Sequence, residues 1–303
     1  MITHDRLHLL AEQNFLREQL VGLPPSARLT RMSTESRLRT IETQLAEMPV
    51  DVREPACARL TFNGSPVIGS HGIFADFGMR AVSAFTDAVA SIAASLSAPL
   101  ASMGPIPNRD QNQLLITHTA VGSFGFELEE FRGAQLPLDD ESTVAIALDR
   151  TQALLQGTLG SDEDLADVAS ETDPRALEKI RTFLKVLADS GAVCALQYRG
   201  RSFRFTDVGQ VRASLERLGA DNLRESEQQL HGEFVGVLPK GRTFEFKLRG
   251  EEKIIRAKVA PTVQNVAELN QHLHQTVAID VMTTQVGNGR PRYLLTHMPV
   301  WEA

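Results

Sequence analysis

The chain has 303 residues, of which 42% are hydrophobic and 23% charged, and its net charge at pH 7 is −7. These proportions are typical of globular proteins and exclude wholesale disorder, and the length favours two or three domains. The negative charge excludes a general electrostatic attraction to nucleic acid or to an anionic membrane, so any such contact needs a local basic patch.

The cysteines and the apolar segments indicate the cellular compartment. Cys57 and Cys194 are the only cysteines, and they do not form a C-x-x-C pair. This favours free thiols in a reducing compartment over a disulfide or a zinc site. The first six residues are polar, and the most apolar window, 84–101, is interrupted by Asp87 and Pro99. We therefore expect a cytoplasmic protein with neither a secretion signal nor a membrane span.

Residues 5–48 have the pattern of two helices joined at Gly22-Leu23-Pro24-Pro25, where proline ends the first helix. In the second helix, apolar residues alternate spacings of three and four, which is the seam of a coiled coil; they are Leu38, Ile41, Leu45 and Met48. The pattern predicts an antiparallel helical hairpin. A two-helix unit has little core, so we expect a second copy, a protein partner or the rest of the chain to cover its apolar stripe.

The middle of the chain alternates between strand and helix patterns. Strands are predicted at 58–62 and 66–68, as a hairpin around Asn63-Gly64, and then at 113–119, 124–130, 193–198 and 202–205. Helices are predicted at 76–96, 141–156, 161–170, 174–190 and 207–218. Asp140, Ser161 and Asp173 are the predicted N-caps of the helices at 141, 161 and 174.

The last part of the chain is rich in strand patterns. Five strands are predicted, at 231–237, 243–248, 253–259, 277–282 and 292–296, with a short helix at 266–272. Short strands with glycine turns favour a small closed β-barrel of the SH3-like or OB-like kind. The predicted fold class is therefore α+β, with a helical hairpin over 1–50, an α/β domain over 51–220 and a barrel over 221–303.

No catalytic motif is assembled in the sequence. Ser70 and His71 are adjacent, but neighbouring residues of an extended chain point to opposite faces, so the spacing favours a turn. The run Gly122–Glu130 lacks the first glycine of a G-x-S-x-G elbow and the lysine of a phosphate-binding loop. A hydrolase would have to gather its residues in three dimensions, with Ser70, His71, His118 and Glu129 as candidates.

Three further groups are candidate ligand sites. Glu127 and Glu129 share one face of their strand and could hold a cation, although a solvated pair is the simpler interpretation. The polar loop 105–112, with Asn108 and Arg109, could bind a ligand or form a surface turn. His272-x-His274 has no acidic or thiol partner nearby. We expect neither a metal nor a cofactor.

The predicted barrel has a local basic excess. Its candidate nucleic-acid-binding residues are Lys240, Arg242, Lys247, Arg249, Lys253, Arg256 and Lys258. Basic residues beside Phe244 and Phe246 are the composition of single-strand binders, but strand alternation places both rings on the core side. By contrast, residues 161–173 are strongly acidic, either as a solvated face or as a dock for a basic surface.

Several runs together resemble a family of bacterial hypothetical proteins. They are Arg31-Met32-Ser33, Leu60-Thr61-Phe62, Gly69-Ser70-His71-Gly72-Ile73 and Gly122-Ser123-Phe124-Gly125-Phe126-Glu127-Leu128-Glu129-Glu130. The resemblance spans most of the chain and implies no activity, cofactor or site residue. It implies only an association with mobile or phage-defence genes.

The sequence therefore favours a non-enzymatic interaction or assembly protein, an accessory component of a bacterial phage-defence or stress system. The first alternative is a nucleic-acid-associated regulator that acts through the barrel. The second is a hydrolase whose site forms only in the folded protein.

Overall fold

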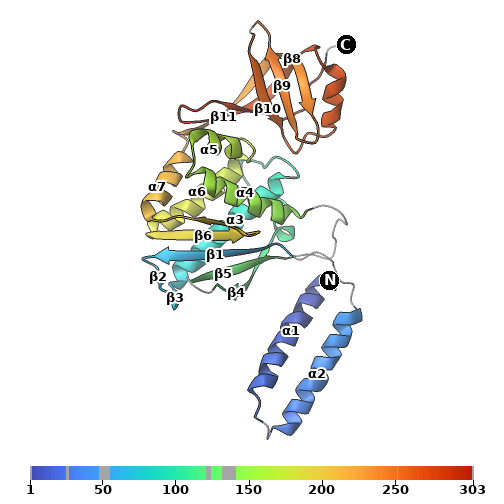
Figure 1. The fold of residues 1–303 in the computed structure, drawn as a ribbon, viewed down its shortest axis with the longest axis vertical. Helices are drawn as coiled ribbons and strands as arrows, with labels where there is room; N and C mark the ends of the chain where they lie inside the picture. Colours follow the sequence, from blue (N-terminus) through green and yellow to red (C-terminus); the bar gives the residue numbers. More distant parts are fainter. Residues whose placement is uncertain are drawn as a thin grey trace. The chain divides into compact units, whose positions relative to one another are not determined.

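The computed structural model describes residues 2–24, 27–47, 55–120, 124–131, 141–250 and 252–301. The contacts divide the chain into two compact units: Met1–Ala56 with Phe131–Asp140, and Cys57–Glu130 with Glu141–Ala303. The second unit, called the body below, contains a mixed helix and sheet region and a closed barrel. The architecture is α+β, as predicted, with helices at the N-terminus and a small barrel at the C-terminus (Figure 1).

The N-terminal unit is a helical hairpin of α1 (Ile2–Gly22) and α2 (Arg28–Glu47). Two ion pairs connect the helices: Arg37 Nε lies 2.7 Å from Glu12 Oε1, and Arg17 Nη2 lies 3.1 Å from Glu42 Oε1. Ile41 of the predicted seam is fully buried. Pro25 of the predicted joint and Met48 of the predicted seam lie outside the described residues.

The body begins with an antiparallel sheet in the order β4-β5-β1-β6-β7. Its strands are β1 (Cys57–Gly64), β4 (Leu114–Thr119), β5 (Phe124–Glu130), β6 (Ala192–Tyr198) and β7 (Arg201–Arg204). On the central strand β1, Ala58, Leu60 and Phe62 are buried, while Cys57 and Arg59 are exposed. This period of two means that one face of the sheet supports the core.

Helices cover the buried face of this sheet (Figure 1). The helices of this layer are α3 (Ala75–Ser95), α4 (Thr143–Gly157), α6 (Pro174–Asp189) and α7 (Val208–Arg217), while α5 (Asp162–Ala169) packs against α4. Ser161 and Asp173 cap α5 and α6 as predicted, and Ser161 forms a capping box with Asp164. Ser142, and not Asp140, caps α4: its side chain accepts a hydrogen bond from the amide of Ala145.

The strand predicted to return from the Asn63-Gly64 turn pairs differently. β2 (Val67–Ile68) pairs with β3 (Gly72–Ile73) and not with β1. Both sides of β1 are already occupied, by β5 and by β6, so no ladder position on β1 remains for β2. The hairpin prediction was therefore wrong about the partner.

The C-terminal strands form a closed barrel in the order β10-β12-β11-β8-β9. They are β8 (Leu223–Leu238), β9 (Thr243–Leu248), β10 (Ile254–Val259), β11 (Thr276–Val286) and β12 (Arg292–Leu295). A 3₁₀ helix, η2 (Val266–His272), lies between the third and fourth of these strands. The third strand pairs in parallel with the fifth. This order is that of an OB-type Greek-key barrel, since an SH3-like meander pairs consecutive strands.

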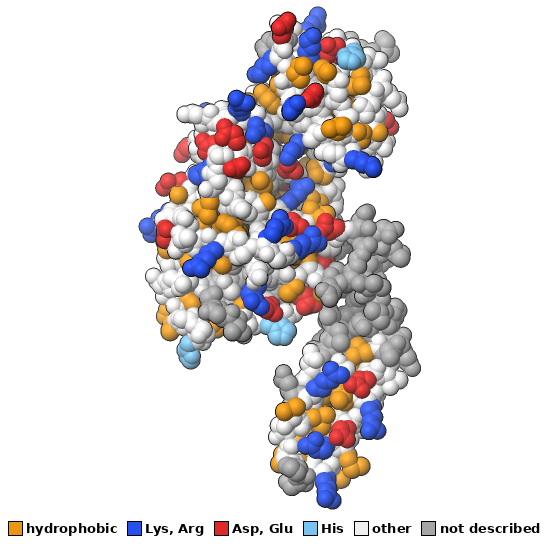
Figure 2. Space-filling view, viewed as in Figure 1, with side chains coloured by type: hydrophobic (Ala, Val, Ile, Leu, Met, Phe, Trp, Pro, Cys, Tyr) orange, Lys and Arg blue, Asp and Glu red, His pale blue; other side chains and the backbone are white. Residues whose placement is uncertain are grey.

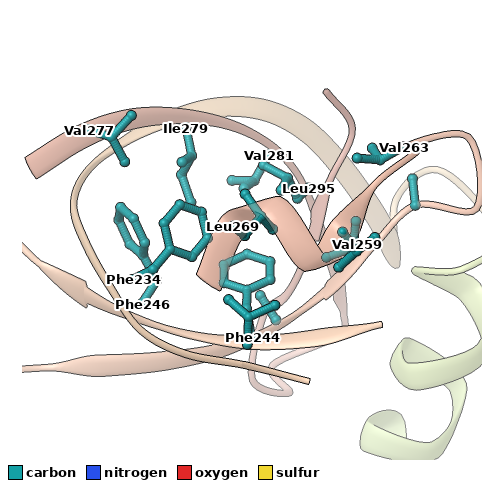
Figure 3. Packing of buried hydrophobic residues seen from close by; sticks show 14 of the residues in the cluster. Phe234, Phe244, Phe246, Val259, Val263, Leu269, Val277, Ile279, Val281 and Leu295 are labelled. Carbon is teal, nitrogen blue, oxygen red and sulfur yellow. The ribbon is translucent and has the colours of Figure 1, made fainter. Parts of the chain in front are cut away.

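Three aromatic side chains fill the centre of the barrel (Figure 3). The rings of Phe234, Phe244 and Phe246 are at most 2% exposed and lie in edge-to-face or tilted contact, with centroids 5.1–6.5 Å apart. Leu269 of η2 packs among them and is fully buried. Such aromatic pairs add to the free energy gained by removing apolar area from water. The inward placement of Phe244 and Phe246 follows the strand alternation, as predicted.

Arg217, at the end of α7, fastens this helix to α5 and to the segment before it. Its Nη1 donates to the carbonyl oxygens of Thr158 and Gly160 at 2.6 and 2.7 Å, and its Nη2 lies 2.9 Å from Asp162 Oδ1. Gly287, at the end of β11, donates its amide to Asn222 O. These bonds connect α5, α7 and the start of the barrel.

Candidate functional site

A cavity of about 770 Å³ lies between α5 and the barrel. We call it the junction pocket. It is lined by Asp167, Ser170, Gly236, Val237, Leu238, Thr243, Phe244, Glu245, Arg256, Ala257, Lys258, Asn270, Arg292 and Tyr293. Figure 2 shows acidic and basic side chains meeting where α5 faces the barrel. Its size is within the range of small-molecule sites.

Ion pairs cross the junction pocket from the helical side to the barrel. Arg292 pairs with Asp167, with its Nη2 3.3 Å from Oδ2, and Lys258 pairs with Glu171. A third pair, Arg256 Nε to Glu245 Oε1 at 2.9 Å, lies within the barrel wall. The acidic run 161–173 therefore docks a basic surface, and that surface belongs to its own chain.

The electrostatic environment of Lys258 is crowded with cations. Burial lowers the pKa of Lys258, and the nearby positive charges of Arg292 and Arg150 lower this pKa further, while Asp167 raises it. Arg150 donates to the carbonyl oxygen of Glu171 at 2.9 Å, and burial lowers its pKa. A group that is costly to keep charged, in a cavity, is a candidate binding group.

The seven basic candidates of the barrel lie in different environments. Arg242 is a structural clamp, because it donates to the carbonyl oxygens of Val259, Ala260 and Val263. Only Arg256 and Lys258 reach the junction pocket. Lys240, Lys247, Arg249 and Lys253 are exposed elsewhere on the barrel. Two of the seven therefore belong to the junction pocket, and nucleic-acid binding by the seven stays a prediction.

The polar loop with Asn108 and Arg109 has a structural explanation. Asn108 adopts the left-handed conformation, with φ 51°, and begins the 3₁₀ helix η1 (Arg109–Gln111). Arg109 pairs with Asp87 on α3. Asn112 Oδ1 accepts a hydrogen bond from the Thr143 hydroxyl at 2.8 Å. These bonds fasten the loop to α3 and α4.

The four candidate hydrolase residues are spread over separate elements. Ser70 and His71 lie in the exposed turn between β2 and β3, while His118 is on β4 and Glu129 on β5. Among the described residues, no side-chain hydrogen bond joins any two of them. His118 Nδ1 lies 3.7 Å from Glu127 Oε2, and Glu127 also accepts from Arg59 at 2.7 Å. Glu127 thus has a basic partner in the sheet.

The remaining candidate metal ligands include His272 and the two cysteines. His272 stacks on Trp301, with ring centroids 4.0 Å apart, and its Nδ1 lies 2.9 Å from Gln275 Oε1. Cys57 is exposed and Cys194 is buried, and neither forms a disulfide. In the part of the chain that the structure describes, no three His, Cys, Asp or Glu side chains are placed to hold a metal ion.

Arg292, Tyr293 and Ser170 line the pocket although no sequence motif marks them, and the pairing of Asp167 with Arg292 was not predicted. One signal could have found the junction: a strongly acidic segment and a basic barrel occur in one chain, and opposite charges favour contact. Which residues meet depends on barrel closure, which brings β12 beside β10.

None of the described helices is both long and apolar enough to cross a membrane. Comparisons with protein-family models, curated proteins and solved structures gave no match to this chain. The resemblance to bacterial hypothetical proteins, and the association with mobile or phage-defence genes that it implies, therefore stay predictions.

Proposed function

We propose that the protein is a non-enzymatic assembly protein whose helical hairpin joins copies of the chain. The observation that carries the proposal is the exposure of large apolar side chains on the hairpin. Phe15 is 63% exposed, Val21 89%, Leu29 84% and Met32 67%. Large apolar side chains gathered on one small unit are typical of an interaction surface.

The occupant of this surface is a second copy of the hairpin. Small units with a limited core often gain stability from a disulfide, a metal or oligomerisation. The hairpin contains no cysteine, since Cys57 and Cys194 both follow it. Its described residues also provide no metal-binding group. Of the three devices, oligomerisation is the one left, and two hairpins that pack their apolar faces together form a four-helix bundle.

The charges on the hairpin agree with this role. Arg17–Glu42 and Arg37–Glu12 are exposed ion pairs between the two helices, and water screens such pairs so that they add little stability. They select the antiparallel pairing of α1 with α2 without supplying a core. The core has to come from apolar contacts, which a second hairpin provides.

The test is the mass of the full-length protein in solution. We expect light scattering at tens of micromolar, an order-of-magnitude concentration for weak association, to show a dimer or a larger oligomer. The double variant Leu29→Glu, Met32→Glu should be monomeric. The matched control is Met79→Glu, because Met79 is equally exposed, at 69%, but lies on α3 of the body. A wild-type protein that is strictly monomeric, or a hairpin variant that associates as wild type does, contradicts the proposal.

A further inference from the structure

The junction pocket combines cationic side chains with a volume far larger than a single ion needs. Three cations line it, Arg256, Lys258 and Arg292, against two carboxylates, Asp167 and Glu245. With Glu171, the partner of Lys258, and Arg150, whose charge acts on Lys258, the local count is four positive and three negative charges. This excess of one positive charge occurs on a protein whose net charge is −7.

The rest of the wall is suited to a planar organic group. Val237 and Leu238 of β8 and the partly buried ring of Tyr293 supply apolar and aromatic surface. Asn270, Ser170 and Thr243 supply hydrogen-bonding groups around it. A base or another flat ring stacks on an aromatic side chain, while amide and hydroxyl groups bond its edge.

We infer that the junction pocket binds a nucleotide unit, with its phosphate on Lys258 and Arg292 and its base against Tyr293. Arginine and lysine are the side chains that bind phosphate through charge-assisted hydrogen bonds. The ligand is either a free nucleotide or one unit of a single-stranded nucleic acid, since both present the same chemistry. The function goes beyond self-association, because it uses no residue of the hairpin.

The carboxylates of the acidic run compete with this ligand. Asp167 and Glu171 already occupy Arg292 and Lys258, so a phosphate has to displace them. In the free protein these carboxylates hold the barrel against α5. Binding of the nucleotide unit therefore loosens the contact between the helical part of the body and the barrel, and removing a carboxylate strengthens binding.

The experiment measures binding by the full chain at low salt with two probes, ATP and a fluorescently labelled single-stranded oligothymidylate. Lys258→Gln and Arg292→Gln should each weaken binding roughly tenfold or more, the usual effect of losing a charge-assisted hydrogen bond. Asp167→Asn should strengthen binding several-fold. Lys185→Gln and Glu216→Gln are the matched controls, because both residues are exposed on other helices, and they should change binding little.

The two probes distinguish the sources of the ligand. If ATP displaces the oligonucleotide, the site takes free nucleotides; if only the oligonucleotide binds, the ligand is a nucleic-acid strand. Circular dichroism melting checks that each variant folds. If Lys258→Gln or Arg292→Gln fails to fold, Asp167→Asn is the deciding variant. If the Asp167–Arg292 pair is purely structural, this variant gains no affinity for either probe. The inference is overturned if neither probe binds, or if the pocket variants bind as the controls do.

Discussion

The hairpin and the barrel have similar apolar content along their sequences, but they differ in how much of it they bury. The barrel closes on itself, so Phe234, Phe244 and Phe246 at its centre are buried. The hairpin has only two helices, and Phe15 and Leu29 remain mostly in water. The comparison shows that topology decides whether an apolar residue is buried within its own unit or stays exposed. A closed sheet has an inside, whereas a helix pair has only a seam.

The largest expected effect comes from removing an aromatic side chain of the barrel core. Phe246→Ala should lower the free energy of unfolding of the body by about 3–5 kcal/mol, because it leaves a cavity among fully buried rings. Ile41→Ala, at the fully buried seam position of the hairpin, should leave the free energy of unfolding of the body unchanged. Denaturant unfolding followed by circular dichroism measures both. An equal loss from the two variants would show that the hairpin and the body unfold as one unit, and the comparison would fail.

A smaller loss of stability is expected from a change in the central sheet, where Gly125 of β5 pairs with Thr61 of β1. A Cβ on Gly125 would lie 2.2 Å from Leu60 O and 2.5 Å from Thr61 Cα. Gly125→Val should therefore destabilise the body by about 1–3 kcal/mol, the usual cost of overpacking, and lower the yield of folded protein. Its matched control is Gly72→Val, since a Cβ there meets nothing within 4 Å. Thermal melting separates the two, and an unchanged melting temperature for Gly125→Val would refute the close approach.

The association measurement can also be made on Gly125→Val, because Gly125 belongs to the body and not to the hairpin. Gly125→Val should leave the association measured by light scattering intact in whatever protein folds. Gly122 and Ser123, in the same sequence run, lie outside the described residues. A loss of association together with a loss of stability would connect the sheet to the hairpin surface.

The smallest expected effect is a difference in pH response. Burial, together with the charge of Asp173, raises the pKa of Glu225 on β8 to about 7. Between its ordinary pKa of 4.5 and about 7, the folded state holds a proton that the unfolded state has lost. Stability of the body therefore falls as pH rises through this window. Glu225→Gln should remove this fall and stabilise the body at pH 8 by on the order of 1–3 kcal/mol.

The hairpin should respond with the opposite sign. A hydrogen bond from Arg37 lowers the pKa of Glu12, so the contribution of this pair is present above pH 4.5 and is lost as pH falls. Urea unfolding at pH 4.5, 6 and 8 tests the body, and helical content over the same range tests the hairpin. If Glu225→Gln and the wild type have parallel pH profiles, Glu225 is not the titrating group.

Much of the local structure was predictable from the sequence. Both helices of the hairpin, the alternation that buries Phe244 and Phe246, and the caps Ser161 and Asp173 all follow from residues within one or two turns of each other. Helix caps and strand faces depend on such neighbours, so a short window of sequence contains the necessary information.

The pairing of distant segments was not predictable in this way. The sequence placed β2 beside β1, but β5 and β6 compete for the edges of β1 and occupy both. The candidate site shows the same limit: of the seven basic residues identified in the barrel, only Arg256 and Lys258 line the junction pocket, while Arg292 was not among them.

The sequence by itself determined which segments are helices and strands, which face of each is apolar, and that an acidic segment and a basic barrel share one chain. Only the tertiary structure decided that β10 pairs with β12, that α5 docks on the barrel, and that Asp167 meets Arg292. The reason is physical. Local preferences act over a few residues, whereas strand partners and ion pairs across 125 positions depend on how the whole core closes.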